Sequence, residues 1–167
     1  TGGPRNGMMT IAGISFNVSE AGGSSGGSND EIAGATVIPN LPYSVSVNTQ
    51  SATTNAADPA HSCASRTTDS KTVWFRYVAN FTGSLRVTTT GSNYDTVLTA
   101  YPGTTSVGSE LACNDDSGAS LQSEITFNVT NGQSYLIEAS GYGVSGGGML
   151  VLAVSSASGG GVGPHVD

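Results

Sequence analysis

The side chains with the clearest capacity for chemistry are carboxylates that fall in turns. Asp115 and Asp116 follow Cys113 and Asn114 at the expected end of a strand, and Asp95 falls in another turn. Calcium takes carboxylate and amide oxygens as ligands, so Asp95, Asp115 and Asp116 are candidate calcium ligands. The alternative is that they hydrogen-bond their own backbone, as Asp and Asn usually do in turns. A hydrolase site at the Asp-Asp pair is not expected, because adjacent side chains on a strand end point apart.

A sequence motif typical of nucleophilic hydrolases is also present. Residues 143–147 read Gly-Val-Ser-Gly-Gly, which matches Gly-x-Ser-x-Gly with Ser145 as the nucleophile. That motif requires a strand, a sharp turn and a helix, followed by an Asp and a His, whereas here a Gly-rich turn precedes a final strand. His61 and His165 fall in a loop and in the tail, where we expect solvated side chains. We therefore predict that the chain is not an enzyme and requires no cofactor, with calcium as the one ion it could bind.

Other polar and aromatic side chains point to recognition or to packing. Three tyrosines near turns would form a sugar-stacking platform if they shared one edge: Tyr94, Tyr101 and Tyr142. Trp74 alternates with Phe75 and Tyr77 in one expected strand, so core packing on opposite faces is the first expectation for them. Three Asn-x-Ser/Thr sequences match the glycosylation acceptor pattern, at Asn17, Asn80 and Asn128.

The composition restricts the elements that can position these residues. Gly supplies 24 of 167 residues, only 10% are charged, and the net charge is −7. Gly, Ser and Thr are poor helix-interior residues, which argues against long helices. One lysine and four arginines cannot neutralise a phosphate backbone, so nucleic acid is excluded as a partner. No apolar run reaches the ~20 residues of a membrane span and no apolar leader opens the chain, so we expect a soluble protein from which any signal peptide has been removed.

Short strand-forming runs separated by turn signals are typical of a β-sandwich or barrel. Ile125, Phe127 and Val129 share one face of such a run, so one face is expected to be buried. The clearest runs are Ser44–Thr49, Thr72–Ala79, Ser84–Thr90, Thr96–Tyr101, Glu110–Cys113, Ser123–Val129, Ser134–Ser140 and Gly148–Ser155. We predict an all-β, jelly-roll-like sandwich of eight or nine antiparallel strands over residues 32–156.

The two cysteines, Cys63 and Cys113, are either buried thiols or a disulfide. A composition rich in Gly, Ser and Thr and poor in lysine is typical of extracytoplasmic proteins, which favours the disulfide. Closing a loop of about 50 residues would stabilise the fold by about 4 kcal/mol on chain-entropy grounds. Neither cysteine has a second Cys or a His at ligand spacing, so a metal site is not expected there.

Residues 1–19 are expected to form a strand or hairpin segment outside the sandwich. The run GMMTIAGISFNVS reads as two short strands around Gly13, and an isolated hairpin of this size is only marginally stable. Its apolar side chains therefore need a partner, either the sandwich of the same chain or a neighbouring subunit. These side chains are Met9, Ile11, Ile14, Phe16 and Val18. A flexible Gly/Ser-rich linker over residues 20–31 and a Gly-rich tail over residues 157–167 complete the predicted organisation.

From about residue 28 to 156 the sequence resembles the secreted bacterial pre-peptidase C-terminal domains, β-sandwiches found beside proteases and in surface proteins. The resemblance rests on SNDEIAGATVIPNLPYSVSVNT, DPAHSC, KTVWFRYV, GSNYDTVLTAYPG, ELACNDDSG and NGQSYLIEASGYGVSGGGMLVLAV. It implies a noncatalytic accessory domain in which Cys63 is bonded to Cys113. The similar collagen-binding domains of secreted collagenases bind calcium where the linker meets the sandwich, which corresponds here to Asn29, Asp30 and Glu31.

The N-terminal segment is similar to the closing strands of bacterial immunoglobulin-like repeats, at Arg5, Gly7, Thr10–Gly13, Phe16 and Val18. That similarity implies a hairpin without its parent sheet, which must pair with another sheet edge or stay exposed.

Two functions follow from these expectations. The first is an extracellular or cell-surface structural or adhesive module that donates its N-terminal strands to a neighbouring subunit, so that its partner is itself and the product is a fibre. The alternative is a targeting module, joined to neighbouring domains of a larger secreted protein, that holds an enzyme on polysaccharide or protein with calcium stabilising the linker.

Overall fold

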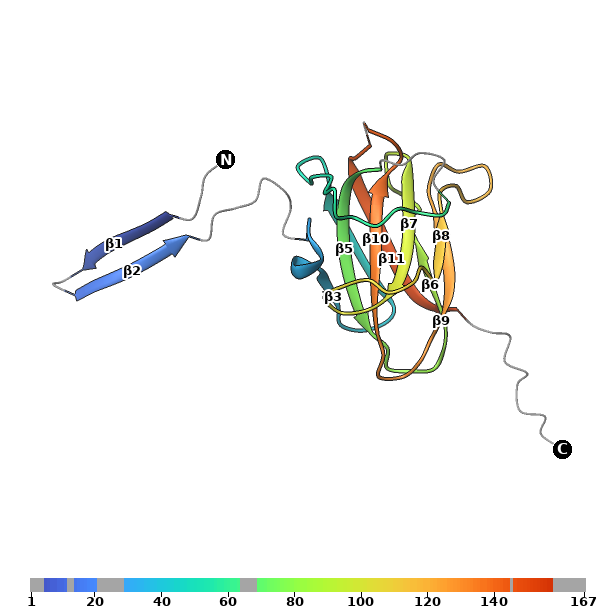
Figure 1. Ribbon diagram of the computed structural model, residues 1–167, viewed down its shortest axis with the longest axis horizontal. Helices are drawn as coiled ribbons and strands as arrows, with labels where there is room; N and C mark the ends of the chain where they lie inside the picture. The colour runs from blue at the N-terminus through green and yellow to red at the C-terminus, as the bar shows by residue number, and fades with distance from the viewer. Residues whose placement is uncertain (1–4, 12–13, 21–28, 64–68, 145, 158–167) are drawn as a thin grey trace.

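The computed structural model describes residues 5–11, 14–20, 29–63, 69–144 and 146–157, with the backbone alone for residues 5–20. It consists of two stacked β-sheets and a two-stranded hairpin (Figure 1). The prediction of an all-β sandwich with one disulfide is confirmed. Among the described residues, no helix has the length and apolar character needed to cross a membrane.

The sandwich contains nine strands. One sheet has the order β3 (Thr36–Ile38), β5 (Ser70–Val78), β10 (Ser134–Gly141), β7 (Thr96–Pro102) and β8 (Ala112–Asn114). The other has the order β4 (Tyr43–Asn48), β11 (Met149–Ala157), β6 (Gly83–Thr88) and β9 (Glu124–Val129). Eight of these strands coincide with the predicted runs to within a few residues, and β3 was not predicted. Because β3 pairs with β5 in parallel, the prediction of a wholly antiparallel sandwich is wrong at that edge.

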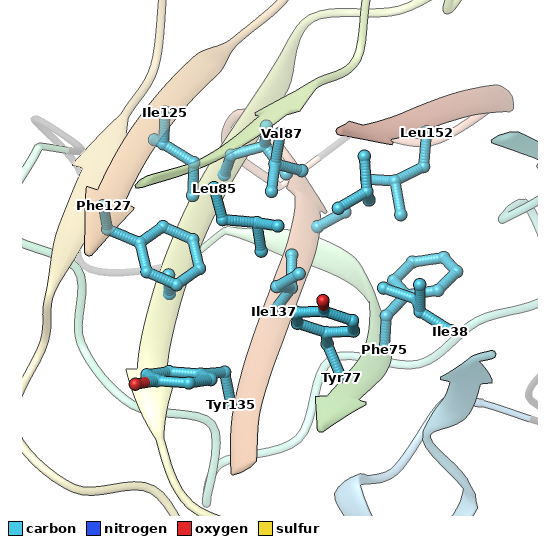
Figure 2. Close-up of a cluster of buried hydrophobic side chains, with 14 of the residues drawn as sticks. Ile38, Phe75, Tyr77, Leu85, Val87, Ile125, Phe127, Tyr135, Ile137 and Leu152 are labelled. Carbon is cyan, nitrogen blue, oxygen red and sulfur yellow. The ribbon is translucent and has the colours of Figure 1, made fainter. Parts of the chain in front are cut away.

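The main core lies between the two sheets (Figure 2). Phe75 and Tyr77 from β5 and Ile137 from β10 face Leu85 and Leu152 of the opposite sheet, and none is more than 1% exposed. Burying one such side chain stabilises the fold by about 1.5–3 kcal/mol. The alternation read in the sequence therefore corresponds to a buried inner face on each sheet.

The outer face of the five-stranded sheet is also partly apolar. Trp74, Tyr101 and Leu136 form a second buried cluster there, and Trp74 lies on the face opposite Phe75, as its place in the strand predicts. Ile32, at the start of the 3-10 helix η1 (Ile32–Gly34), packs against this cluster. This face therefore has its own covering segments.

The predicted N-terminal hairpin is confirmed. Strands β1 (Arg5–Ile11) and β2 (Ile14–Glu20) are antiparallel, with Arg5 opposite Glu20 and Ile11 opposite Ile14. They form a sheet of their own, and neither pairs with another strand in the described part of the chain. The five apolar side chains assigned to assembly lie outside the described side chains.

The boundary between linker and sandwich lies earlier than the sequence predicts. Asn29 and Asp30 are only 2% and 3% exposed. The Trp74 N–H donates to the Asn29 carbonyl at 2.8 Å, and Thr53 donates to the Asp30 carboxylate through its backbone N–H and its hydroxyl. Asn29 and Asp30 therefore do not belong to a flexible linker, because hydrogen bonds of these buried residues attach them to β5 and to the loop that precedes it. Residues 21–28 and 158–167, the rest of the predicted linker and most of the tail, lie outside the described residues.

Candidate binding site

The loop between β4 and β5 spans residues 49–69 and crosses the outer face of the five-stranded sheet (Figure 1). The disulfide between Cys63 and Cys113 attaches it to β8, at the far edge of that sheet, which confirms the predicted disulfide. The Ser62 N–H donates to the Glu110 carboxylate at 3.0 Å, and the Ser62 hydroxyl donates to the same group. The loop is therefore fixed at β8 before it returns to β5.

A cavity of about 340 Å³ lies between this loop and the sheet. Residues 54–56 and 58–61 of the loop form its walls, while Asp69, Thr72 of β5 and Glu138 of β10 complete its lining. Thr72 and Glu138 are buried, whereas Ala56 and Ala60 at the rim are exposed. Sites for small molecules commonly have volumes of about 300–1,000 Å³, so the cavity has room for a small ligand.

His61 lies between two carboxylates of this lining. Its Nδ1 lies 2.7 Å from Asp69 Oδ2. Its Nε2 lies 3.0 Å from Glu138 Oε2, which is within ion-pair distance, but the geometry is not that of a hydrogen bond. The side chains of His61 and Asp69 are each 5% exposed. Burial alone would lower the pKa of His61, but the hydrogen bond to Asp69 and the nearby Glu138 raise it to about 10. The expectation of a solvated loop histidine is wrong, and His61 is a buried imidazolium at neutral pH.

Glu138 lines the cavity and has one carboxylate oxygen without a hydrogen-bond partner among the described residues. The Tyr101 hydroxyl donates to its Oε2 at 3.2 Å, on the same side as His61. Its Oε1 is buried and has no hydrogen-bond partner among the described residues. Burial raises the pKa of Glu138, and the contacts with His61 oppose that shift. Because an unpaired buried acceptor is unfavourable by about 1–3 kcal/mol, a ligand that donates to Oε1 would be stabilised there.

Asp58 provides the third carboxylate of the cavity. The Asn55 N–H donates to its Oδ2 at 3.1 Å. Burial raises the pKa of Asp58, while that hydrogen bond and the side chain of Thr72 lower it. Next to it, the Asn55 side-chain amide donates to Glu31 at 2.9 Å. The wall of the cavity is therefore ordered by hydrogen bonds and offers a carboxylate without a cationic partner among the described residues.

The Gly-rich turn between β10 and β11 positions Asp69. The Gly143 N–H donates to Asp69 Oδ1 at 3.3 Å. A Cβ atom on Gly141 would lie 2.5 Å from the Gly146 Cα, so the two backbones can approach only because both residues are glycine. The Gly-x-Ser-x-Gly motif therefore lies in a tight connection between two strands. Ser145 lies outside the described residues.

The predicted calcium ligands fall into two separate groups. Asp95, Asp115 and Asp116 come together, with one oxygen of each within 4.8 Å of the others. Burial and the neighbouring Asp95, Asp116 and Asp69 raise the pKa of Asp115 to about 6. Three carboxylates that each bind through one oxygen supply at most half of the six to eight oxygens that calcium takes, and calcium binding at this cluster stays a prediction.

The calcium ligands implied at the start of the sandwich, Asp30 and Glu31, accept hydrogen bonds from the β4–β5 loop, and calcium binding there stays a prediction. Both Asp30 carboxylate oxygens accept hydrogen bonds from Thr53, and both Glu31 carboxylate oxygens accept from Asn55. These carboxylates stabilise the attachment of the β4–β5 loop, and neither belongs to the acidic cluster.

The other candidate residues occupy ordinary structural positions. Tyr101 is 2% exposed in the Trp74 cluster and Tyr94 packs against the main core, so the three tyrosines do not meet the condition of sharing one edge as a stacking platform. Asn80 and Asn128 are exposed, and their Oδ1 atoms accept hydrogen bonds from hydroxyl groups. Glycosylation at these two residues stays a prediction, and the side chain of Asn17 lies outside the description.

The fold and the cavity together define a β-sandwich with a covered sheet face, a form that suits a binding domain. Residues 28–145 match the T9SS-associated family described as "Galactose binding domain-like", and with this extent of match the chain belongs to that family. The family places it among secreted or cell-surface accessory and binding modules that form part of larger proteins. No curated protein matches the chain. The resemblance to pre-peptidase C-terminal domains is not confirmed, and the immunoglobulin-like segment lies outside the match.

Proposed function

We propose that the chain is a noncatalytic saccharide-binding module that holds a larger secreted protein on its substrate. The observation that carries this proposal is the cavity under the β4–β5 loop, whose buried floor includes the unpartnered Oε1 of Glu138. Sugar hydroxyls donate hydrogen bonds, and the cavity offers them carboxylate acceptors at Glu138 and Asp58.

The remaining lining suits a sugar ring in size and in polarity. Ala56, Pro59 and Ala60 present small apolar groups, which can contact the C–H face of a ring without excluding its hydroxyls. Among the described residues, the lining contains no Phe, Trp or Tyr side chain. We therefore expect recognition through hydrogen bonds to hydroxyl groups, with moderate affinity, and not through ring stacking.

The test is retention of the full chain on a panel of insoluble and soluble polysaccharides, followed by NMR titration with glucose and galactose. Asp58→Ala is expected to weaken binding at least about fivefold, because a hydrogen bond to a charged group contributes about 1.5–3 kcal/mol. Asp116→Ala, which removes an exposed carboxylate outside the cavity, is the matched control and should bind as the wild type does. Absence of binding to every saccharide, or equal loss in both variants, would exclude this cavity as the site.

Strand donation to a neighbouring subunit is a second candidate, favoured by one observation. The hairpin β1–β2 pairs with no other described strand, so its outer edges carry unpaired backbone groups. Such edges can add to the sheet of another copy, and a head-to-tail contact of this kind produces a filament. Electron microscopy and light scattering should show filaments for the full chain and monomers after deletion of residues 1–23. Monomers from both, or filaments from both, would refute strand donation.

A further inference from the structure

We propose that the cavity selects a saccharide that carries a free amine, bound as its ammonium form between Asp58 and Glu138. This inference rests on the proposed function of the same cavity and specifies the class of its ligand. It starts from an imbalance of charge and of hydrogen-bonding groups in the lining.

The lining carries more negative than positive charge. Three carboxylates, Asp58, Asp69 and Glu138, face one imidazolium, His61, which contacts only the latter two. No lysine or arginine lines the cavity in the described part of the chain. Asp58 therefore stands without a cationic partner among those residues, and a cationic ligand group would provide one.

The hydrogen-bonding capacity is equally one-sided. Glu138 is 1% exposed, and its Oε1 accepts no hydrogen bond from any described residue. The two ring nitrogens of His61 already face the carboxylates of Asp69 and Glu138, although Nε2 makes no straight hydrogen bond. An ammonium group has three donors and no acceptor, whereas a hydroxyl also brings lone pairs that need a donor. An ammonium group therefore complements this lining better than a hydroxyl does.

The two carboxylates proposed to bind the amine, Asp58 and Glu138, also interact with each other electrostatically. The negative charge of Asp58 contributes to the raised pKa of Glu138, which indicates that the two carboxylates repel each other across the cavity. A cation placed between them would replace that repulsion with two attractions. An acetylated amine has lost the charge and could not do so.

The experiment is an NMR titration of the isotope-labelled full chain with glucosamine, glucose and N-acetylglucosamine at slightly acidic pH and low salt. The backbone amide signals of residues 54–58 and of Ala60 report binding at the cavity. We expect glucosamine to bind about tenfold more tightly than glucose, which corresponds to about 1.4 kcal/mol, and N-acetylglucosamine to bind no more tightly than glucose.

Asp58→Asn should reduce the preference for glucosamine to threefold or less, and Asp116→Asn should leave it unchanged. Asp58 is the better test residue than Glu138, whose buried contacts also stabilise the fold. Because Arg66 lies outside the described residues, the titration is repeated with Arg66→Gln to remove an internal competitor. If neither the wild type nor the Arg66→Gln variant prefers glucosamine to glucose although both sugars bind, the amine inference is overturned and the saccharide function stands. If no sugar binds to either protein, both proposals are wrong.

Discussion

His61 retains its proton because two carboxylates, Asp69 and Glu138, lie on either side of it. In the folded chain its pKa is raised to about 10, whereas the unfolded value is 6.5. Since the folded state binds the proton more tightly, the stability that His61 contributes is fully present below about pH 6.5 and is lost as the pH rises toward 10. The raised pKa of Asp115 acts in the same direction at lower pH, so the protein should be most stable on the acidic side of neutrality.

We predict that His61→Gln lowers the free energy of unfolding by about 3 kcal/mol near neutral pH, because two buried carboxylates lose the cation between them. The difference from the wild type should shrink as the pH rises from about 7 to about 10, since the wild type then loses the same proton. Urea unfolding of the wild type and of the His61→Gln variant across this pH range measures the difference in the free energy of unfolding. A difference that does not change with pH would contradict a buried imidazolium.

Asp115→Asn should have the opposite effect on stability. Burial and the neighbouring Asp95 and Asp116 disfavour the charged Asp115 carboxylate, so the variant should be more stable above about pH 6, by about 1 kcal/mol or less because the group is partly exposed. Thermal unfolding in the presence of a chelator measures the change. Adding calcium tests the other interpretation of the cluster, since bound calcium would raise the melting temperature of the wild type and leave that of the variant unchanged.

The sequence predicts a contact between two residues when both lie at the ends of neighbouring strands. Asp95 and Asp115 follow that rule, because β7 and β8 are adjacent and both residues lie at strand ends. The contact of His61 with Glu138 does not follow it, because it depends on a long loop crossing a sheet whose strand order the sequence does not specify. A charged residue among the apolar side chains in the middle of β10 is the signal in the sequence for a buried polar site.

At the scale of elements, the alternation of apolar and polar residues predicts the strands and their buried inner faces. It does not predict the loop that covers the outer face of the five-stranded sheet. β3 was missed because three residues are too few for a period of two to be recognised. The β4–β5 loop was read as a connection, since its composition resembles that of any turn-rich segment. Its path follows from the disulfide and from the hydrogen bonds of Ser62 to Glu110, which are contacts between distant residues.

We predict that replacing Cys63 and Cys113 together by Ser leaves a folded sandwich that is up to about 4 kcal/mol less stable, because the closed loop no longer restricts the unfolded chain. Saccharide binding at the cavity should fall at least about tenfold, since the loop residues that form its walls lose their attachment to β8. Chemical unfolding and the NMR titration measure the two effects. Full binding by a folded double variant would show that the disulfide does not position the loop.

At the scale of the whole molecule, the sandwich begins before its first strand. Asn29 and Asp30 contribute buried hydrogen bonds to Trp74 and Thr53, and the linker composition around them conceals this role. Amino-acid composition describes a segment as a whole, so it cannot show that the last few residues of a predicted linker belong to the folded domain. The structure therefore moves the start of the domain to residue 29 or earlier.

A chain that begins at residue 29 should consequently keep the stability of the full protein, whereas one that begins at residue 32 should lose about 2–4 kcal/mol. The loss follows from two groups of hydrogen bonds that are removed from a buried region. Thermal unfolding of both truncated chains and of the full chain compares them directly. Equal melting temperatures for all three would show that residues 29–31 are dispensable.

The disulfide that attaches the β4–β5 loop also makes ligand binding at the cavity depend on the compartment in which that disulfide forms. The cavity combines residues 54–56 and 58–61 with Asp69, Thr72 and Glu138, and only the folded chain brings them together. Before oxidation the loop depends on noncovalent contacts at β8, and the cytoplasm keeps thiols reduced. If the cavity binds saccharides as we propose, a newly made chain would acquire its full affinity only after export and would not capture sugars inside the cell that makes it.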